Sequence, residues 1–243
     1  MIHYIFRDET LTYADYFALE ASCFPGDAPT EKQFANILTL DYWTARADNS
    51  ALAGFMYVKP IGGGLHVTHI ETAPAFRRQG IATNLLALAE AHERNLGYPR
   101  LTLRVLTDNA PAQAAYLKFG LAFTGRKMCR FGLDLPAEIA AEPLEIRRLQ
   151  SDGAAYSYAV EFLSGGRKLG SGVFNEELGG CKDLYLENPE SLLPGAMAAL
   201  LPLVKPELPA LYLMSDAADV IAACASYPLR LQSEILDMAK ELR

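Results

Sequence analysis

Short apolar segments alternate with helical repeats of apolar residues along the first 135 residues. Apolar runs or alternation predict strands, and apolar residues three or four positions apart predict amphipathic helices. Strands are expected at residues 2–7, 42–47, 51–59, 65–72, 101–106, 121–124 and about 129–135, and helices at 13–21, 30–40, 80–96 and 110–119. This order predicts an α/β fold.

The strongest helix signal covers residues 80–96. Ile81, Leu85 and Leu88 share one face, and Gly97 follows in a position where helices commonly end on a left-handed residue. The other expected capping residues are Thr30, Asn109 and Gly120. These signals make the helices of the first half the best-defined part of the prediction.

Residues 144–243 repeat this order of elements in a weaker form. Strands are expected at 158–163, 168–174, 182–186 and 211–214, and helices at 191–204 and 217–226. The distance along the sequence from the end of one strand to the start of the next is similar in the two halves. It is 29 residues from Thr72 to Leu101 and 25 residues from Leu186 to Leu211. We therefore predict a structural repeat, with domains at 1–135 and 144–243 and a linker at 136–143.

Composition places the chain among globular proteins. It is 51% hydrophobic and 21% charged, which is sufficient for a large core. The net charge of −7 argues against nucleic acid or an anionic membrane surface as a partner. The charge is uneven, because residues 1–135 hold 13 basic and 13 acidic side chains, whereas residues 136–243 hold 9 and 16.

Neither a signal peptide nor a membrane span is expected. The first residues lack a basic segment followed by a long apolar run, and the longest nearly apolar run, 195–204, is about half the length a span needs. The cysteines Cys23, Cys129, Cys181 and Cys224 lie far apart, without metal-ligand spacing. We expect buried free thiols in a reducing cytoplasm.

The segment 72–83 joins a predicted strand to the strongest helix. A helix N-terminus offers unpaired backbone N–H groups and the positive end of the helix dipole. Gly80 allows close approach of a ligand, and Arg77 and Arg78 add positive charge, so the segment suits a pyrophosphate. A strand–turn–helix with solvated arginines is the alternative. The glycine pattern is neither that of a Walker loop nor that of a Rossmann fingerprint.

Two motifs here resemble those of the GNAT superfamily of N-acetyltransferases. Residues 77–82, Arg-Arg-Gln-Gly-Ile-Ala, resemble its coenzyme A pyrophosphate loop, and residues 109–121 resemble its second motif, Asn-x-x-Ala-x-x-x-Tyr-x-x-x-Gly-Phe, with Leu121 in place of the usual Phe. The resemblance implies a mixed, mostly antiparallel sheet, splayed open beside acetyl-CoA and flanked by helices. The second half is interpreted as a degenerate copy of that fold.

The resemblance also assigns residues to the coenzyme. The end of the strand at residues 70–72 would contact the pantetheine arm and the acetyl group. Residues 77–83 would hold the pyrophosphate, and Asn109 would contact the pantetheine arm. The assigned residues are Ile70, Glu71, Thr72, Arg77, Arg78, Gln79, Gly80, Ile81, Ala82, Thr83 and Asn109. Acetyl-CoA is the implied cosubstrate, and no metal is expected.

Tyr116 and His66 are the candidate catalytic residues. Tyr116 lies where the family often places its general acid, and a phenol is protonated at pH 7; the alternative is a core aromatic residue. His66 lies where some members carry a base, and imidazole titrates near neutrality; the alternatives are a half-buried sheet histidine or proton transfer to water alone. Strand alternation places His66 and His69 on opposite faces unless a bulge intervenes.

The acceptor pocket is expected at the loop 22–29. Phe24 and Tyr42 are candidates for its wall, and Asp27 or Asp41 for an ammonium ligand; a plain surface loop fits the same residues. In the second half, acidic residues replace the arginines of the loop, at Glu187 and Glu190. They would repel phosphate, so this half is expected to have lost acetyl-CoA.

These observations predict a cytoplasmic enzyme that transfers the acetyl group of acetyl-CoA directly to a primary amine of a small molecule or protein. The alternatives are a non-catalytic acyl-CoA-binding module and an interaction protein whose acidic half binds a cationic partner. A monomer or homodimer is expected. If the acidic half borders the acceptor site, its field favours a cationic amine.

Overall fold

The computed structural model describes residues 1–25, 29–135, 137–149, 157–227 and 229–242, which form two compact units. The first unit comprises Met1–Val105, Asn109–Thr124 and Asp237–Arg243, and the second comprises Leu106–Asp108 and Gly125–Leu236. None of the described helices is long and apolar enough to cross a membrane.

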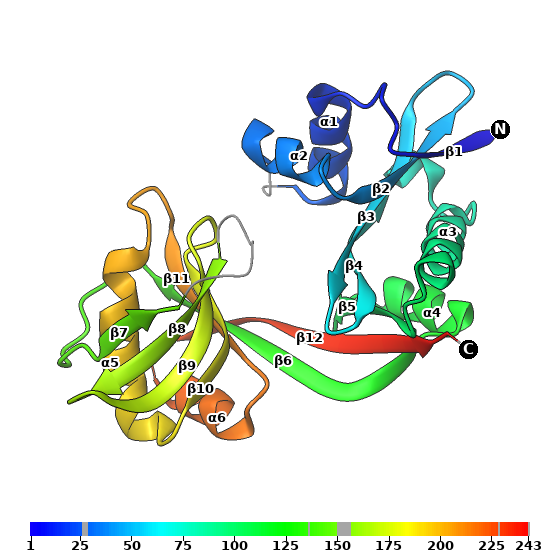
Figure 1. Cartoon of the computed structure of the whole chain (residues 1–243). Coiled ribbons are helices and arrows are strands. Elements are labelled where there is room, and N and C mark those ends of the chain that lie inside the picture. The colour runs from blue at the N-terminus through cyan, green and yellow to red at the C-terminus, as the bar shows by residue number, and fades with distance from the viewer. Residues whose placement is uncertain (26–28, 136, 150–156, 228, 243) are drawn as a thin grey trace. The chain divides into compact units, whose positions relative to one another are not determined.

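The first unit is a sheet with helices on both faces (Figure 1). Its elements are β1 (Ile2–Phe6), α1 (Tyr13–Cys23), α2 (Glu31–Ile37), β2 (Asp41–Ala47), β3 (Leu52–Ile61), β4 (Gly64–Thr72), the 3-10 helix η1 (Pro74–Phe76), α3 (Ile81–Leu96), β5 (Arg100–Leu106), α4 (Ala110–Phe119) and the start of β6 (Ala122–Asp134). Strands β1 to β4 are antiparallel neighbours in chain order, whereas β4 and β5 are parallel.

Helices α1 and α3 pack on opposite faces of this sheet. On one face the ring of Phe55 in β3 lies 5.0 Å from that of Tyr16 in α1, inside a buried cluster. On the other face a Cβ at Gly54 would lie only 2.7 Å from Ile81 Cγ2, so α3 approaches the strand closely where the side chain is missing. The predicted capping residues Thr30, Asn109, Gly97 and Gly120 are confirmed.

Strand β4 departs from regular pairing on both of its edges. Along β3, Tyr57 lies opposite His69 and the next residue, Val58, lies opposite Val67, so Thr68 is an extra residue that forms a β-bulge. Along β5, the ladder comprises three residue pairs, from Leu65 to Val67 of β4, although both strands continue further. The two parallel strands therefore part after Val67.

A buried carboxyl group ties α3 to the start of β4. Glu93 is completely buried, and its Oε1 accepts a hydrogen bond of 2.9 Å from the Leu65 backbone N–H. Burial raises the pKa of Glu93 to about 7. This contact fixes the helix beside the first pair of the parallel ladder between β4 and β5.

The second unit confirms the predicted repeat. Its elements are β7 (Glu145–Arg148), β8 (Ser157–Ser164), β9 (Arg167–Asn175), β10 (Gly180–Leu186), α5 (Pro189–Leu200), the 3-10 helix η2 (Leu201–Leu203), β11 (Ala210–Ser215), α6 (Ala218–Ser226) and most of β12 (Arg230–Glu241). Strand β10, which precedes α5, pairs in parallel with β11, just as β4 pairs with β5 in the first unit. Strand β10 also carries an irregularity in its pairing with β9, between Lys182 and Tyr185.

Two strands run through both units. The strand order β5-β12-β6 places the C-terminal strand between two strands of the first half. Within the first unit, Asp237 pairs with Arg104 at 3.1 Å, and Lys240 Nζ donates to Glu90 and to the Phe119 carbonyl oxygen. Each compact unit combines segments that are separate in the sequence. The predicted domains at 1–135 and 144–243 therefore stay a prediction.

The sequence analysis missed β12 and divided β6 in two. Leu231, Ile235 and Met238 are spaced like residues on one helix face, although they lie in a strand. The expected strands at 121–124 and about 129–135 form the single strand β6, which continues through Gly125 at a φ of +85°. The predicted linker begins at residue 136, which lies outside the described residues; its later part precedes β7, which the sequence analysis also missed.

A buried ion pair joins β2 to the segment before α1. Asp8, 2% exposed, accepts from Arg46 Nε at 2.6 Å, from Thr44 Oγ1 at 2.9 Å and from Thr10. Burial alone would raise the pKa of Asp8, but these hydrogen bonds outweigh it and lower the pKa to about 2. The pair thereby holds the start of α1 against the sheet.

We predict that Asp8→Asn destabilises the first unit by about 2 kcal/mol at pH 7, the value of a pKa lowered from 3.8 to about 2. Since the folded pKa is lowered, this stabilisation is present above pH 3.8 and is lost as the pH falls toward 2. Trp43, the only tryptophan, lies in β2 and reports unfolding by fluorescence. Asp48→Asn, at an exposed ion pair, is the matched control and should have little effect. Equal effects of the two variants would contradict the prediction.

We also predict that Glu93→Gln raises Tm by several degrees at pH 8.5 and changes it little at pH 5. The amide oxygen still accepts from Leu65, but the buried charge is removed. With a folded pKa of about 7, raised from 4.5, the native carboxyl stabilises the fold below pH 4.5 and loses this contribution as the pH rises through 7. A lower Tm at both pH values would show instead that the added N–H is not accommodated.

Candidate functional site

The segment between β4 and α3 has two residues in left-handed conformation. After η1 the chain turns through Arg78, at φ +63°, and Gly80, at φ +77°, and Ile81 begins α3. Arg77, Arg78, Gln79 and Gly80 are all exposed. A non-glycine residue in this region costs about 1–2 kcal/mol, and such strain is concentrated at functional sites.

This geometry suits an anion. The first N–H groups of α3, from Ile81 onward, lack helical partners, and Gly80 is its N-cap without a side-chain hydrogen bond. A Cβ at Gly80 would meet no atom of the described residues within 4 Å, so these residues leave the approach to the N–H groups open. Arg77 Nε donates to the Thr72 carbonyl oxygen at 3.3 Å, which orders one cation beside the helix N-terminus.

The other residues that the sequence analysis assigned to the coenzyme lie on either side of this loop. Ile81 is buried against the sheet, so only its backbone is available to a ligand, whereas Ala82 is half-buried and Thr83 exposed. At the end of β4, Ile70 and Thr72 are half-buried, and the predicted contacts of this strand end with a coenzyme stay a prediction.

Helix α4 positions Asn109 and Tyr116. The Asn109 side-chain oxygen accepts from the Ala112 backbone N–H at 3.2 Å, so this side chain caps the helix. Tyr116 is only 8% exposed, and burial raises its pKa to about 12, so its hydroxyl is protonated at neutral pH. Both interpretations of Tyr116, as an acid and as a core aromatic residue, fit this position.

His66 lies just before the point where β4 and β5 part. It is half-buried, and its Nδ1 lies 2.9 Å from Oγ1 of Thr102, the residue opposite it on β5. This contact spans the last part of the parallel ladder. The role of His66 as a base stays a prediction.

The exception that the sequence analysis allowed for is present, because a bulge brings His66 and His69 to the same face of the sheet. His69 lies opposite Tyr57 and His66 opposite Lys59, and these two residues of β3 are two positions apart. Since alternate residues of a regular strand share a face, and directly opposite residues do too, His66 and His69 share the face that α1 covers. Thr68 supplies the extra residue.

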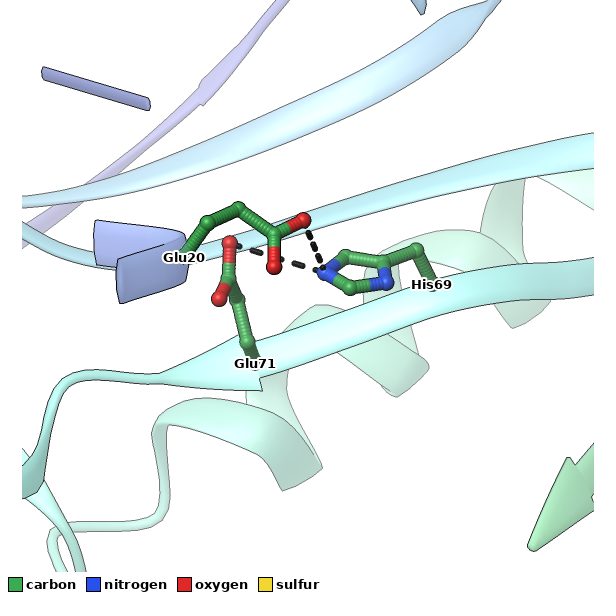
Figure 2. A group of neighbouring side chains, drawn as sticks. All are labelled: Glu20, His69 and Glu71. Atoms are coloured by element: carbon green, nitrogen blue, oxygen red, sulfur yellow. Dashed lines mark ion pairs between the residues drawn. The ribbon is translucent and has the colours of Figure 1, made fainter. Parts of the chain in front are cut away.

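On this face Nε2 of His69 points toward two carboxylates, those of Glu20 and Glu71 (Figure 2). Its Nε2 is 3.0 Å from Oε1 of Glu20, near the end of α1, and 3.6 Å from Oε1 of Glu71, two residues further along β4. The side chains of Glu20 and Glu71 are 9% and 1% exposed, and that of His69 is 20% exposed. We name these three residues the carboxylate–histidine cluster.

The cluster holds unequal charges. The two carboxylates outweigh the effect of burial on His69 and raise its pKa to about 9, so the imidazole is protonated at neutral pH. Burial acts to raise the pKa of Glu20, but the charge of His69 lowers it below its ordinary value. Burial raises the pKa of Glu71, and neither of its carboxylate oxygens makes a hydrogen bond within the described residues.

Aromatic rings surround His69. Tyr57 stacks on it with ring centroids 5.7 Å apart, and the half-exposed ring of Phe24 lies 5.5 Å away on the loop after α1. The Tyr16 hydroxyl donates to Glu20 at 2.5 Å and thereby orients that carboxylate. The sequence analysis named Phe24 and Glu71 separately but missed Glu20 and the role of His69, because no local motif joins them.

The remaining candidates for the acceptor pocket lie elsewhere. Asp41 pairs with Arg7 at 2.8 Å and with His92 at 2.9 Å, and Tyr42 is buried with its hydroxyl donating to the Asp8 carbonyl oxygen. Asp27 lies outside the described residues.

The corresponding loop of the second unit has different chemistry. Pro189 occupies the first turn of α5 and removes one backbone N–H from the helix N-terminus. Glu187, which pairs with Arg167, lies directly after β10, in the segment where the first unit has Arg77 and Arg78. These features support the prediction that this half does not bind a pyrophosphate.

Comparison with known proteins agrees with this architecture. A sequence model of the Acetyltransferase (GNAT) family matches residues 13–121. No curated protein matches the sequence. A crystal structure of a GCN5-related N-acetyltransferase from Sphaerobacter thermophilus is similar, with a TM-score of 0.71 at 14% identity over 99% of this chain and 96% of that one.

Two further solved structures resemble the chain over nearly its whole length. A tandem GNAT protein from the clavulanic acid biosynthesis pathway has a TM-score of 0.69 at 16% identity, covering 99% of this chain and 98% of that one. A putative acetyltransferase from Pyrococcus horikoshii has a TM-score of 0.73 at 12% identity, covering 100% and 89%. At these identities the likeness shows the fold, and the sequence match adds the family. Residues 13–121, which contain the strand–loop–helix segment, therefore belong to the Acetyltransferase (GNAT) family, and the chain as a whole has the fold of tandem GNAT structures.

Proposed function

We propose that this protein transfers an acetyl group from acetyl-CoA directly to a primary amine. One observation carries the proposal: β4 and β5 part after three residue pairs, beside the loop that opens the 16-residue helix α3. Parted strands leave backbone N–H and C=O groups that an extended pantetheine arm can pair with. The helix N-terminus and its arginines then meet the phosphates.

The coenzyme residues are proposed to act mainly through backbone and charge. Arg77 and Arg78 neutralise the pyrophosphate, and Gly80 exposes the N–H groups that bind it. The end of β4, Ile70 to Thr72, pairs with the pantetheine arm. Gln79, Ile81, Ala82, Thr83 and Asn109 complete the site.

Bound acetyl-CoA supplies the thioester, and this chain supplies a proton donor and a proton acceptor. The amine nitrogen attacks the carbonyl carbon, the C–N bond forms, and the C–S bond breaks to release a thiolate. Tyr116 gives its hydroxyl proton to that thiolate, which its pKa of about 12 permits because the phenol stays protonated. His66 accepts the proton that the amine loses, directly or through water.

We predict that Arg77→Ala and Arg78→Gly each weaken acetyl-CoA binding about tenfold, the effect of losing one charge-assisted contact. Arg78→Gly should leave Tm unchanged or higher, because glycine adopts a φ of +63° without strain. Calorimetry with CoA and thermal unfolding measure the two effects. Arg167→Ala, at an exposed ion pair of the second unit, is the control. Unchanged binding in both loop variants would exclude this loop as the phosphate site.

We predict that Tyr116→Phe lowers kcat about 100-fold and leaves acetyl-CoA binding unchanged, since only the acid is lost. Free-thiol release in the presence of acetyl-CoA and a panel of amines measures kcat. Native kcat in the variant would make Tyr116 a core aromatic residue. An intact protein that binds acetyl-CoA but releases no thiol with any amine would instead be a non-catalytic acyl-CoA-binding module.

A further inference from the structure

We propose that the carboxylate–histidine cluster, Glu20, His69 and Glu71, binds an ammonium group of the acceptor, so that the acceptor is an alkyldiamine or another amine with a second positive charge. This inference rests on the proposed function, because it names the substrate class of the same enzyme. The three side chains of the cluster include neither the proposed proton donor nor any residue of the proposed phosphate loop.

When both of its carboxyl groups are ionised, the cluster lacks one positive charge. Two carboxylates face a single imidazolium, and Glu71, 1% exposed at its side chain, has no hydrogen bond to either oxygen within the described residues. Burying an ionised carboxylate without hydrogen bonds is costly, so a donor from outside the chain would stabilise the charged form of Glu71. An ammonium group brings one positive charge and three N–H donors.

The surroundings favour an ammonium over a metal ion. His69 is protonated at neutral pH, which directs an N–H rather than a lone pair toward the carboxylates. The rings of Phe24 and Tyr57 lie 5.5 and 5.7 Å from the imidazole ring, and aromatic faces beside carboxylates are a means of recognising organic cations. His69, 20% exposed, and Phe24, 41% exposed, give the cluster a route to solvent.

The position of the cluster relates it to the transfer reaction. Glu71 lies between Ile70 and Thr72, in the part of β4 that has left β5. An amine that attacks a thioester must be neutral, whereas an amine held by buried carboxylates stays protonated. One nitrogen therefore cannot easily meet both requirements, and a diamine divides them between two groups.

Calorimetry of the full chain with 1,4-diaminobutane and with butylamine, in the absence of acetyl-CoA, tests the proposal independently of catalysis. The diamine should bind at least roughly tenfold more tightly than the monoamine. Glu71→Gln and Glu20→Gln should each remove this preference, whereas Glu9→Gln, at an exposed glutamate, should retain it. Thermal unfolding of each variant verifies that it is folded.

Three results would overturn the assignment: equal binding of the two amines, an unchanged preference in folded Glu71→Gln, or stoichiometric Zn²⁺ binding that Glu71→Gln abolishes. Thiol release with acetyl-CoA is measured in parallel. Acetyl transfer to butylamine as fast as to 1,4-diaminobutane would uphold the transferase and reject the diamine site. Diamine binding without transfer would uphold the site and reject the transferase.

Discussion

The extra residue at Thr68 is the constraint on which the arrangement of β4 depends. A strand with regular alternation would turn His66 and His69 to opposite faces. With the bulge, both histidines and Glu71 face α1, while Val67 remains toward α3. Directly beyond the last β5 partner, the same bulge marks where the parallel ladder ends. The second unit carries an irregularity at the same place in its order of elements, so both copies bend the strand that precedes the crossover helix.

Sequence reasoning succeeded where the signal is local. Helix α3, its N-cap Gly80 and its C-cap Gly97 lie within about twenty residues, and they can be predicted without knowledge of the partners of each element. The carboxylate–histidine cluster was missed for the opposite reason. Glu20 and His69 are 49 positions apart, and they meet only because α1 packs over a bulged strand. A bulge leaves no reliable mark in one sequence, since Thr68 suits a regular strand equally well.

The same distinction applies to the fold. Strands β1 to β5 and helices α1 to α4 follow from apolar spacing and capping residues, and the structure bears them out to within a few residues. Strand β12 does not, because its apolar residues follow helical spacing and its partners in the first half are remote in sequence. Tertiary pairing, rather than local propensity, decides such a segment.

The position of β12 between β5 and β6 has a consequence for how the chain folds during synthesis. Asp237 and Lys240 supply contacts to Arg104, Glu90 and Phe119 in the first unit. An emerging polypeptide that already contains β1 to β5 and helices α1 to α4 therefore still lacks one strand of the sheet of the first unit. The sheet of the first unit closes only after residues 237–241 have left the ribosome. Folding is thereby coupled across the full sequence, which raises its contact order and delays the first half until the last strand arrives.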